Sequence, residues 1–429
     1  MSRTASAFTE LAGRIHAFIR ASSDDPIAPV TTEAAPPSAA ARRHLGGSGR
    51  DPSERREDTA PAAVGQPEPP GRRRSIAEVA TVARETEFNT LALALFALQS
   101  QHNPALRALA NARTAAQPPA HWREIRPVPV AAFKELEVTV LPSEARTTVF
   151  HSSGTTGQIP SRHFHSAESL RLYEASLLPW FRRHLHADST DANPKPEPQQ
   201  LFLTPSPQAA PHSSLAHMFG TIAAASRGAR AAFLGRVDAD GAWNLDFENA
   251  LTQLRVAAAS DSPVIVFGTA FLFVHLLDQL AAQNTVVKLP VGSRVLETGG
   301  YKGRSRTLPK VELHREITRR LGVPPSHLVC EYGMSELSSQ AYDTAVPARA
   351  DEPRRFRFPP WARALIVSPE TGSEVSDGET GLIRIYDLAN VWSALAVQTE
   401  DLGVRRGDGF ELLGRAALAE PRGCSRLTD

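Results

Sequence analysis

The chain has 429 residues and a formal net charge of +1 at pH 7, so charge gives no argument for nucleic acid or an anionic membrane as a general partner. Hydrophobic residues make up 41% and charged residues 22%, which is typical of a globular protein with a sizeable core. The only two cysteines, Cys330 and Cys424, form no CxxC pair, which excludes a disulfide framework and favours a reducing cytoplasm. The N-terminus lacks the unbroken apolar core of a secretory signal. The most apolar run, 264–280, is too short and too interrupted for a membrane span.

The predicted elements fall into four segments. Apolar residues at helical spacing predict an amphipathic helix within residues 1–25. Segment 26–74 is rich in Pro, Ala, Arg, Glu and Gly and contains no aromatic residue. Such a segment cannot bury enough apolar surface to offset its conformational entropy, so we predict that it is disordered. Residues 75–415 are predicted to form one large domain, and residues 416–429 a flexible tail.

Within the large domain the pattern predicts an α/β fold. Residues 88–101 are apolar nearly all round and predict a buried helix. Apolar runs typical of strands follow at 201–207, 231–235, 264–270, 293–300 and 327–333. Helical patterns separate several of these runs, which favours a largely parallel sheet. From Trp361 onward, strands joined by tight turns predict a smaller β-rich part.

The stretch HSSGTTGQIPSR, residues 151–162, concentrates glycines and hydroxyl residues. Glycines let the backbone come close to a ligand and point N–H groups at it, and hydroxyls add donors, so the stretch suits phosphate binding. It lacks both GxxxxGK[ST] and GxGxxG, so it is neither a P-loop of that class nor a dinucleotide fingerprint. On composition alone, a surface turn is an alternative.

The sequence SSGTTG, followed by a proline and a basic residue, resembles the phosphate loop of the adenylate-forming (ANL) enzymes. These enzymes activate a carboxylate with ATP to give an acyl-adenylate and pyrophosphate. The resemblance assigns phosphate binding to Ser152, Ser153, Gly154, Thr155, Thr156 and Gly157. The family usually carries a lysine after the proline. Here Ser161 and Arg162 follow Pro160, which implies that Arg162 supplies the positive charge.

Further motifs follow in the family's order. CEYGMSELSSQAYD, residues 330–343, resembles the motif whose aromatic residue packs on adenine and whose glutamate holds Mg²⁺, which implies these roles for Tyr332 and Glu336. Without the resemblance, Tyr332 would be interpreted as a core aromatic residue and Glu336 as a solvated carboxylate. AVQTEDLG resembles the ribose-binding motif, with Asp401 as its aspartate, and FELLGR resembles the hinge that contains Arg415. The resemblance thus assigns the nucleotide to Gly299, Gly300, Tyr332, Gly333, Ser335, Asp401 and Arg415.

Several stretches resemble one branch in particular, the LuxE-type acyl-protein synthetases, which are long-chain-fatty-acid–protein ligases of bacterial luminescence. They are ETGGYKGRSR, YGMSELSSQAYD, PPWARALIV and GLIRIYDLANVWSALAVQTEDLG. The resemblance covers roughly residues 76–427 and implies the large N-terminal adenylation domain of the superfamily. Only fourteen residues follow Arg415, so the usual C-terminal subdomain with its catalytic lysine is expected to be absent. In this branch a cysteine close to the C-terminus accepts the acyl group as a thioester. Cys424 matches that place, and two flanking arginines favour its thiolate.

Other residues carry candidate roles. Lys302 follows Gly299 and Gly300 and is a candidate catalytic residue in place of the missing lysine. The alternative is that Lys302 is an ordinary charged residue of the surface. His163 and His165 alternate around a phenylalanine as on a strand and share a face. A metal site there is a minor alternative, because no third ligand stands out. Cys330 ends an apolar run and is predicted to be a buried structural thiol.

These observations favour an ATP- and Mg²⁺-dependent, AMP-forming acyl-protein synthetase in the cytoplasm. It would activate a carboxylic acid, by resemblance a fatty acid, load Cys424 and deliver the acyl group to a partner such as an acyl reductase. One alternative is an acyl- or aryl-CoA ligase resembling the phenylacetate-CoA ligases. Another is a non-catalytic subunit that binds nucleotide or acyl groups.

Overall fold

A parallel sheet forms the centre of the computed structural model, which describes residues 3–23, 76–111, 117–152, 159–189, 197–226, 228–300 and 306–416. Its strand order is β11–β10–β9–β8–β4–β5, and every pair is parallel except β10 with β11. The strands are β4 (Gln199–Phe202), β5 (Ala231–Phe233), β8 (Val264–Thr269), β9 (Arg294–Thr298), β10 (Leu328–Tyr332) and β11 (Ala341–Tyr342). A parallel sheet needs cover on both faces, and this one has it.

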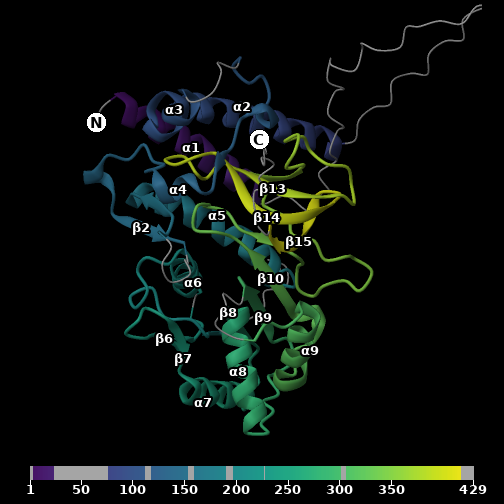
Figure 1. Cartoon of the computed structure of the whole chain (residues 1–429). Helices are drawn as coiled ribbons and strands as arrows, with labels where there is room; N and C mark the ends of the chain where they lie inside the picture. The colour runs from purple at the N-terminus through teal and green to yellow at the C-terminus, as the bar shows by residue number, and fades with distance from the viewer. Residues whose placement is uncertain are drawn as a thin grey trace, which may run out of the picture.

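Alternate residues of the parallel strands point to two separate cores. Phe202, Phe267 and Leu296 belong to the core on the side of α5 (Ala167–Leu185) and α6 (Ser214–Ala225). Val266 and Val295, each one residue away on its strand, belong to the core formed with α7, α8 and α9. These three helices span Phe247–Ala258, Ala270–Ala282 and Lys310–Leu321, and they lie at the lower end of the molecule in Figure 1.

A second sheet packs beside the carboxyl end of the first. Its order is β1–β14–β13–β12, and β15 pairs with the second half of β14. The strands are β1 (Val128–Pro129), β12 (Ala362–Val367), β13 (Thr380–Asp387), β14 (Ala396–Arg406) and β15 (Gly409–Arg415). Tyr386 on one face contacts Trp122, whereas Ile383 and Ile385 on the other share a core with Tyr332 of β10. The second sheet is therefore positioned to form one wall of any site at the end of β10.

The remaining elements cover the second sheet or form hairpins. The helices α1 (Arg3–Ser23), α2 (Ile76–His102) and α3 (Pro104–Asn111) lie at the end of the molecule opposite α7–α9 (Figure 1). Helix α4 (Ala132–Glu135) follows β1. One hairpin consists of β2 (Thr148–His151) and β3 (Arg162–His165), and the other of β6 (Gly235–Val237) and β7 (Trp243–Leu245). Short 3₁₀ turns lie at Trp122–Glu124, Ser143–Ala145 and Pro325–His327.

The predicted α/β class, the first helix and the five parallel strands are confirmed. One strand differs in position: β4 covers Gln199–Phe202 and does not continue to 207, where Pro205 and Pro207 cannot donate to a ladder. The connection 388–395 between β13 and β14 is wholly buried, where a tight turn was expected. The segment predicted to be disordered, 26–74, lies outside the described residues, and the domain boundaries stay predictions. None of the helices described is long and apolar enough to cross a bilayer.

Candidate active site

Strands β9 and β10 end side by side, because Thr298 pairs with Glu331 in the parallel register. Gly299–Gly300 and the segment from Tyr332 onward therefore leave the sheet at the same edge, where open α/β sheets bind ligands. Gly299 has φ +66°, a left-handed conformation that favours glycine. Among the described residues, no atom lies within 4 Å of a Cβ added at Gly299 or Gly300.

The glycine- and hydroxyl-rich stretch connects two antiparallel strands. The register pairs His151 with Arg162, and the next two residues inward close the base of the loop. There the backbone N–H of Ser161 donates to Ser152 Oγ over 2.9 Å, and that of Ser152 donates to Ser161 O over 3.2 Å. The residues expected to touch phosphates, Ser153, Gly154, Thr155, Thr156 and Gly157, lie outside the described residues and stay predictions.

Glu336 lies beside this loop and is only 3% exposed. Its Oε1 accepts a short hydrogen bond from Ser161 Oγ, and its Oε2 accepts one from Ser335 Oγ over 3.1 Å. Behind it, His163 Nδ1 lies 2.8 Å from Ser335 O. Burial raises the pKa of Glu336, while the hydrogen bonds from Ser161 and Ser335 lower it. A largely desolvated carboxylate whose partners are neutral hydroxyls suits a hard divalent cation such as Mg²⁺.

Arg162 lies on the opposite face of β3 from Ser161 and His163. Its Nη1 is 3.6 Å from Glu137 Oε1, and its guanidinium lies 5.7 Å from the ring centroid of Phe164. Successive residues of a strand point to opposite faces, so Ser161 faces Glu336 and Arg162 does not. The described contacts thus do not bring Arg162 to Glu336, and its role in charge compensation stays a prediction.

Tyr332, the last residue of β10, is joined to Asp401 of β14. Its hydroxyl donates to Asp401 Oδ2 over 2.8 Å, and Asp401 Oδ1 lies 3.9 Å from Arg415 Nε. Burial raises the pKa of Asp401, and the Tyr332 hydrogen bond and the Arg415 charge oppose that rise. The Tyr332 ring is 7% exposed and packs against Phe356 and Phe410, so it belongs to the core in this conformation. Its contact with adenine stays a prediction.

Two candidate residues were missed in the sequence. Ser161 stands directly after Pro160, where the family carries its lysine, and that position was the available signal. Glu331 is a carboxyl in an otherwise apolar strand, which was a signal as well. Burial raises the pKa of Glu331 to about 7, a hydrogen bond from Thr298 Oγ1 lowers it, and the charge of Glu297 raises it. A Cβ on the neighbouring Gly333 would collide with the Glu331 carboxylate, so a larger residue there would force that carboxylate to move.

The remaining predicted residues separate into two groups. Lys302 and Cys424 lie outside the described residues. Cys330 is 1% exposed, which confirms the prediction of a buried thiol. His163 and His165 share a face as expected, with ring centroids 4.2 Å apart, and burial lowers the pKa of His163 to about 4. In the part of the chain that the structure describes, no third metal-ligand side chain joins this pair.

Comparison with solved structures shows the class of fold. The chain is similar to 2-hydroxyisobutyryl-CoA ligase in the postadenylation state in complex with 2-HIB-AMP, with a TM-score of 0.56 and 13% identity over 78% of this chain and 68% of that one. A second structure of that ligase, in complex with R3-HIB-AMP, gives the same values. At this identity the likeness concerns the fold alone, and that fold is the one of the adenylate-forming ligases.

Sequence comparison narrows the class to one family. The model of the acyl-protein synthetase LuxE matches residues 208–428, just over half of the chain, and the protein therefore belongs to the LuxE acyl-protein synthetase family. One relative is the long-chain-fatty-acid–luciferin-component ligase of Aliivibrio fischeri, 25% identical over 194 residues. That alignment covers 42% of this chain and 49% of the relative, so it spans about half of the relative's length.

Proposed function

We propose that the protein activates a carboxylic acid with ATP and then transfers the acyl group to its own Cys424. The main support for the proposal is that three elements far apart in the sequence place candidate residues at one edge of the parallel sheet. The β2–β3 hairpin contributes Ser161, the end of β10 contributes Tyr332 and Glu336, and β14 contributes Asp401. The name of the relative indicates a long-chain fatty acid as the substrate class.

In the first half-reaction a carboxylate oxygen of the acid attacks the α-phosphorus of ATP, and pyrophosphate leaves. The loop amides and hydroxyls between Ser152 and Ser161 would hold the phosphates, and Asp401 would accept hydrogen bonds from the ribose hydroxyls. Glu336 fits the position of a Mg²⁺ ligand, because it is buried and its side-chain hydrogen-bond partners among the described residues are the hydroxyls of Ser161 and Ser335. A bound Mg²⁺ would offset the negative charge that accumulates on the phosphates.

In the second half-reaction a thiolate attacks the carbonyl carbon of the acyl-adenylate, a thioester forms and AMP leaves. Cys330 is unsuited to this role. Burial, then the charges of Asp343 and Glu297, raise the pKa of its thiol well above the usual range, and its Sγ donates to Glu297 Oε2 over 3.0 Å. Cys424 is the other cysteine of the sequence and stands between Arg422 and Arg426. We propose it as the acceptor, from which an acyl reductase partner would take the acyl group.

Intact-mass measurement tests both half-reactions. The purified full chain is incubated with ATP, Mg²⁺ and a mixture of fatty acids, beside Cys424→Ala and the matched variant Cys330→Ala. We expect an acyl adduct, cleaved by hydroxylamine, on the wild type and on Cys330→Ala but not on Cys424→Ala. AMP release that requires CoA without any adduct would instead show an acyl-CoA ligase. Neither adduct nor AMP with any acid would show a non-catalytic subunit.

A further inference from the structure

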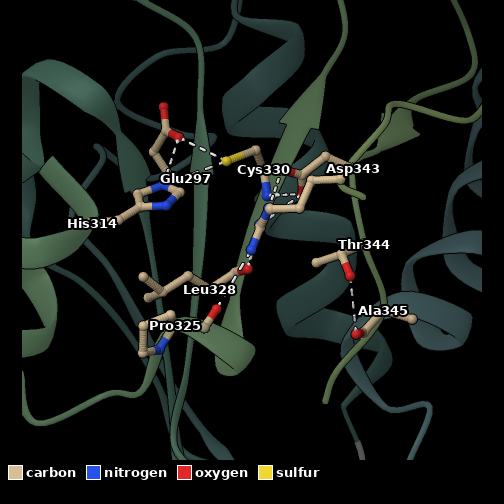
Figure 2. A network of polar contacts seen from close by, with 9 residues as sticks. Glu297, His314, Pro325, Leu328, Cys330, Asp343, Thr344 and Ala345 are labelled. Carbon is tan, nitrogen blue, oxygen red and sulfur yellow. Dashed lines mark hydrogen bonds and ion pairs between the residues drawn. The ribbon is translucent and has the colours of Figure 1, made fainter. Parts of the chain in front are cut away.

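Three different ligand types meet on the α9 side of the parallel sheet. Glu297 on β9 and Cys330 on β10 are directly paired in the parallel register, so their side chains leave the sheet next to each other. Helix α9 packs on this face through Leu313 and Ile317, which carries His314 over the pair. Figure 2 shows the Glu297 carboxylate next to both the Cys330 thiol and the His314 ring. The three ligand atoms lie within 4.8 Å of one another.

The edges of this triangle lie within about 0.5 Å of those of a tetrahedral site. Cys330 Sγ is 3.0 Å from Glu297 Oε2 and 3.6 Å from His314 Nε2, and His314 Nε2 is 3.6 Å from Glu297 Oε2. With Zn–S and Zn–N or Zn–O bonds of about 2.3 and 2.0 Å, ligand atoms of a tetrahedral site are about 3.3–3.6 Å apart. The sulfur–nitrogen edge matches its expected length of about 3.5 Å, and the nitrogen–oxygen edge is about 0.3 Å longer than expected. The sulfur–oxygen edge is about 0.5 Å shorter than expected and would lengthen once the thiol proton between sulfur and carboxylate is lost.

We propose that Glu297, His314 and Cys330 bind a divalent transition-metal ion of the Zn²⁺ class. Thiolate, imidazole and carboxylate together favour Zn²⁺ over the hard ions Mg²⁺ and Ca²⁺, which prefer oxygen ligands. Three protein ligands leave a fourth position for water. On binding, the thiol proton of Cys330 passes to solvent, a sulfur–metal bond forms, and no oxidation is involved.

The surroundings hold the Cys330 ligand in place. The backbone N–H of Cys330 donates to Asp343 Oδ1 over 2.8 Å. Arg354 donates from Nε to Asp343 Oδ2 over 2.9 Å and from Nη2 to Leu328 O over 2.6 Å. Metal sites depend on such supporting hydrogen bonds to orient their ligands. Because Asp343 is engaged on both oxygens, it supports the site and is not counted as a fourth ligand.

Two nearby positive charges, on Lys310 and Arg354, oppose a cation at this position. Lys310, one helical turn before His314 on α9, interacts electrostatically with Cys330 and Glu297. Its Nζ lies 5.0 Å from the Phe356 ring centroid. Removing the ammonium while keeping a long apolar side chain should therefore strengthen metal binding, because like charges repel. The proposal therefore predicts the direction in which a Lys310 variant changes the metal affinity.

The proposed ion would also hold the edge that carries the candidate active site. Glu297 precedes Gly299 by two residues, and Cys330 precedes Tyr332 by two residues. A cation shared by β9, β10 and α9 would fix the relative positions of these strand ends. The inference concerns a different site from the adenylation centre and does not depend on that activity.

Cobalt titration tests the proposal directly. The untagged full chain is treated with a chelator, freed of it, and titrated with Co²⁺ in the absence of ATP. We expect one Co²⁺ per chain and the near-ultraviolet absorption of a thiolate–cobalt bond. With only two cysteines in the sequence, the assignment is unambiguous: the band should vanish in Cys330→Ser and persist in Cys424→Ser. Absence of the band from the wild type, or its survival in Cys330→Ser, would overturn the proposal.

Variants of the other two ligands provide a test that does not depend on correct folding of the cysteine variant. His314→Ala and Glu297→Gln should each weaken Zn²⁺ binding at least tenfold in competition with a chromophoric chelator, with unchanged far-ultraviolet circular dichroism. His275→Ala, on the neighbouring α8, is the matched control and should bind as the wild type does. Lys310→Met should bind more tightly. Unchanged affinity in folded His314→Ala, or weaker binding in Lys310→Met, would contradict the proposed ligand set.

Discussion

The hydroxyl of Tyr332 donates a hydrogen bond to Asp401 Oδ2 over 2.8 Å and joins the end of β10 to β14 of the other sheet. Asp401 is 22% exposed at its side chain, and its other oxygen lies 3.9 Å from Arg415 Nε, an ion-pair distance. The carboxylate that is proposed to hold the ribose is therefore oriented by a residue of the parallel sheet. The two sheets fix this part of the site together.

Tyr332→Phe removes that hydrogen bond and keeps the ring in its core. We expect the KM for ATP to rise roughly tenfold or more with kcat little changed, because a hydrogen bond to a charged group contributes about 1.5 kcal/mol or more and Asp401 acts on binding. ATP–pyrophosphate exchange at varied ATP measures this. Tyr386→Phe is the control, because its hydroxyl donates to Ile125 O away from the site. An equal change of KM in both variants would contradict an orienting role for Tyr332.

Glu336→Gln separates activity from stability. The amide keeps an acceptor for Ser161 but loses the charge that is proposed to hold Mg²⁺, so exchange activity should fall about 100-fold or more. Burial raises the pKa of Glu336, which means that its ionised form is disfavoured in the folded state. The free energy of unfolding should consequently stay equal or increase. Both are measured on one preparation, by exchange kinetics and by urea unfolding.

Glu137→Gln is the matched control for this experiment, since it removes a carboxylate from the outer face of β3 beside Arg162. It should leave exchange activity within about twofold, the range expected of a surface change. A large loss in Glu137→Gln with full activity in Glu336→Gln would show that the catalytic charge lies on the Arg162 face.

The contrast between Ser161 and Arg162 shows where sequence reasoning stopped. The loop and the order of motifs could be recognised, but which of two adjacent residues faces Glu336 depends on the register of the β2–β3 hairpin. A slip of one residue would exchange their faces. Arg162 was chosen because of its charge. In the structure the alternation of side chains along the strand places Ser161, and not Arg162, next to Glu336.

The sequence predicted which side chains are buried, but not which side chains they contact. The apolar run ending at Cys330 predicted a buried thiol, because alternation and β-propensity are local properties. The meeting of Cys330 with His314 depends on how α9 crosses the sheet, which no local pattern encodes. The parallel strands could be predicted for the same reason as the burial of Cys330, because each strand is a short apolar run bounded by polar residues.

His184 predicts an acid-dependent loss of stability. It is 4% exposed, and burial lowers its pKa to about 4, while the hydrogen bond to Trp180 O opposes that shift. In the unfolded chain the ordinary pKa is about 6.5, so between pH 6.5 and 4 the unfolded state binds a proton that the folded state does not. The contribution of neutral His184 is thus fully present above pH 6.5 and is lost as the pH falls.

His184→Gln should therefore lose less free energy of unfolding than the wild type between pH 7 and pH 4, by about 3 kcal/mol at most. Urea unfolding at half-unit pH intervals measures the difference. Above pH 7 the two curves should run parallel, because the imidazole is neutral in both states. Parallel curves over the whole range would show that His184 does not titrate between the folded and unfolded states.

Gln99 shows how one polar side chain can hold the largely apolar helix α2 against segment 388–395. It is fully buried in α2, its Nε2 donates to Asn390 O and Val391 O over 2.8 and 3.0 Å, and its Oε1 accepts from the Leu395 N–H over 2.9 Å. Gln99→Leu keeps the volume but leaves three buried backbone groups without these partners. We expect a loss of about 2–4 kcal/mol in the free energy of unfolding, measured by urea denaturation. Gln101→Leu, exposed on the same helix, should change it by less than about 0.5 kcal/mol. Equal stability of the two variants would mean that water or a local rearrangement satisfies segment 388–395, and that Gln99 does not hold it.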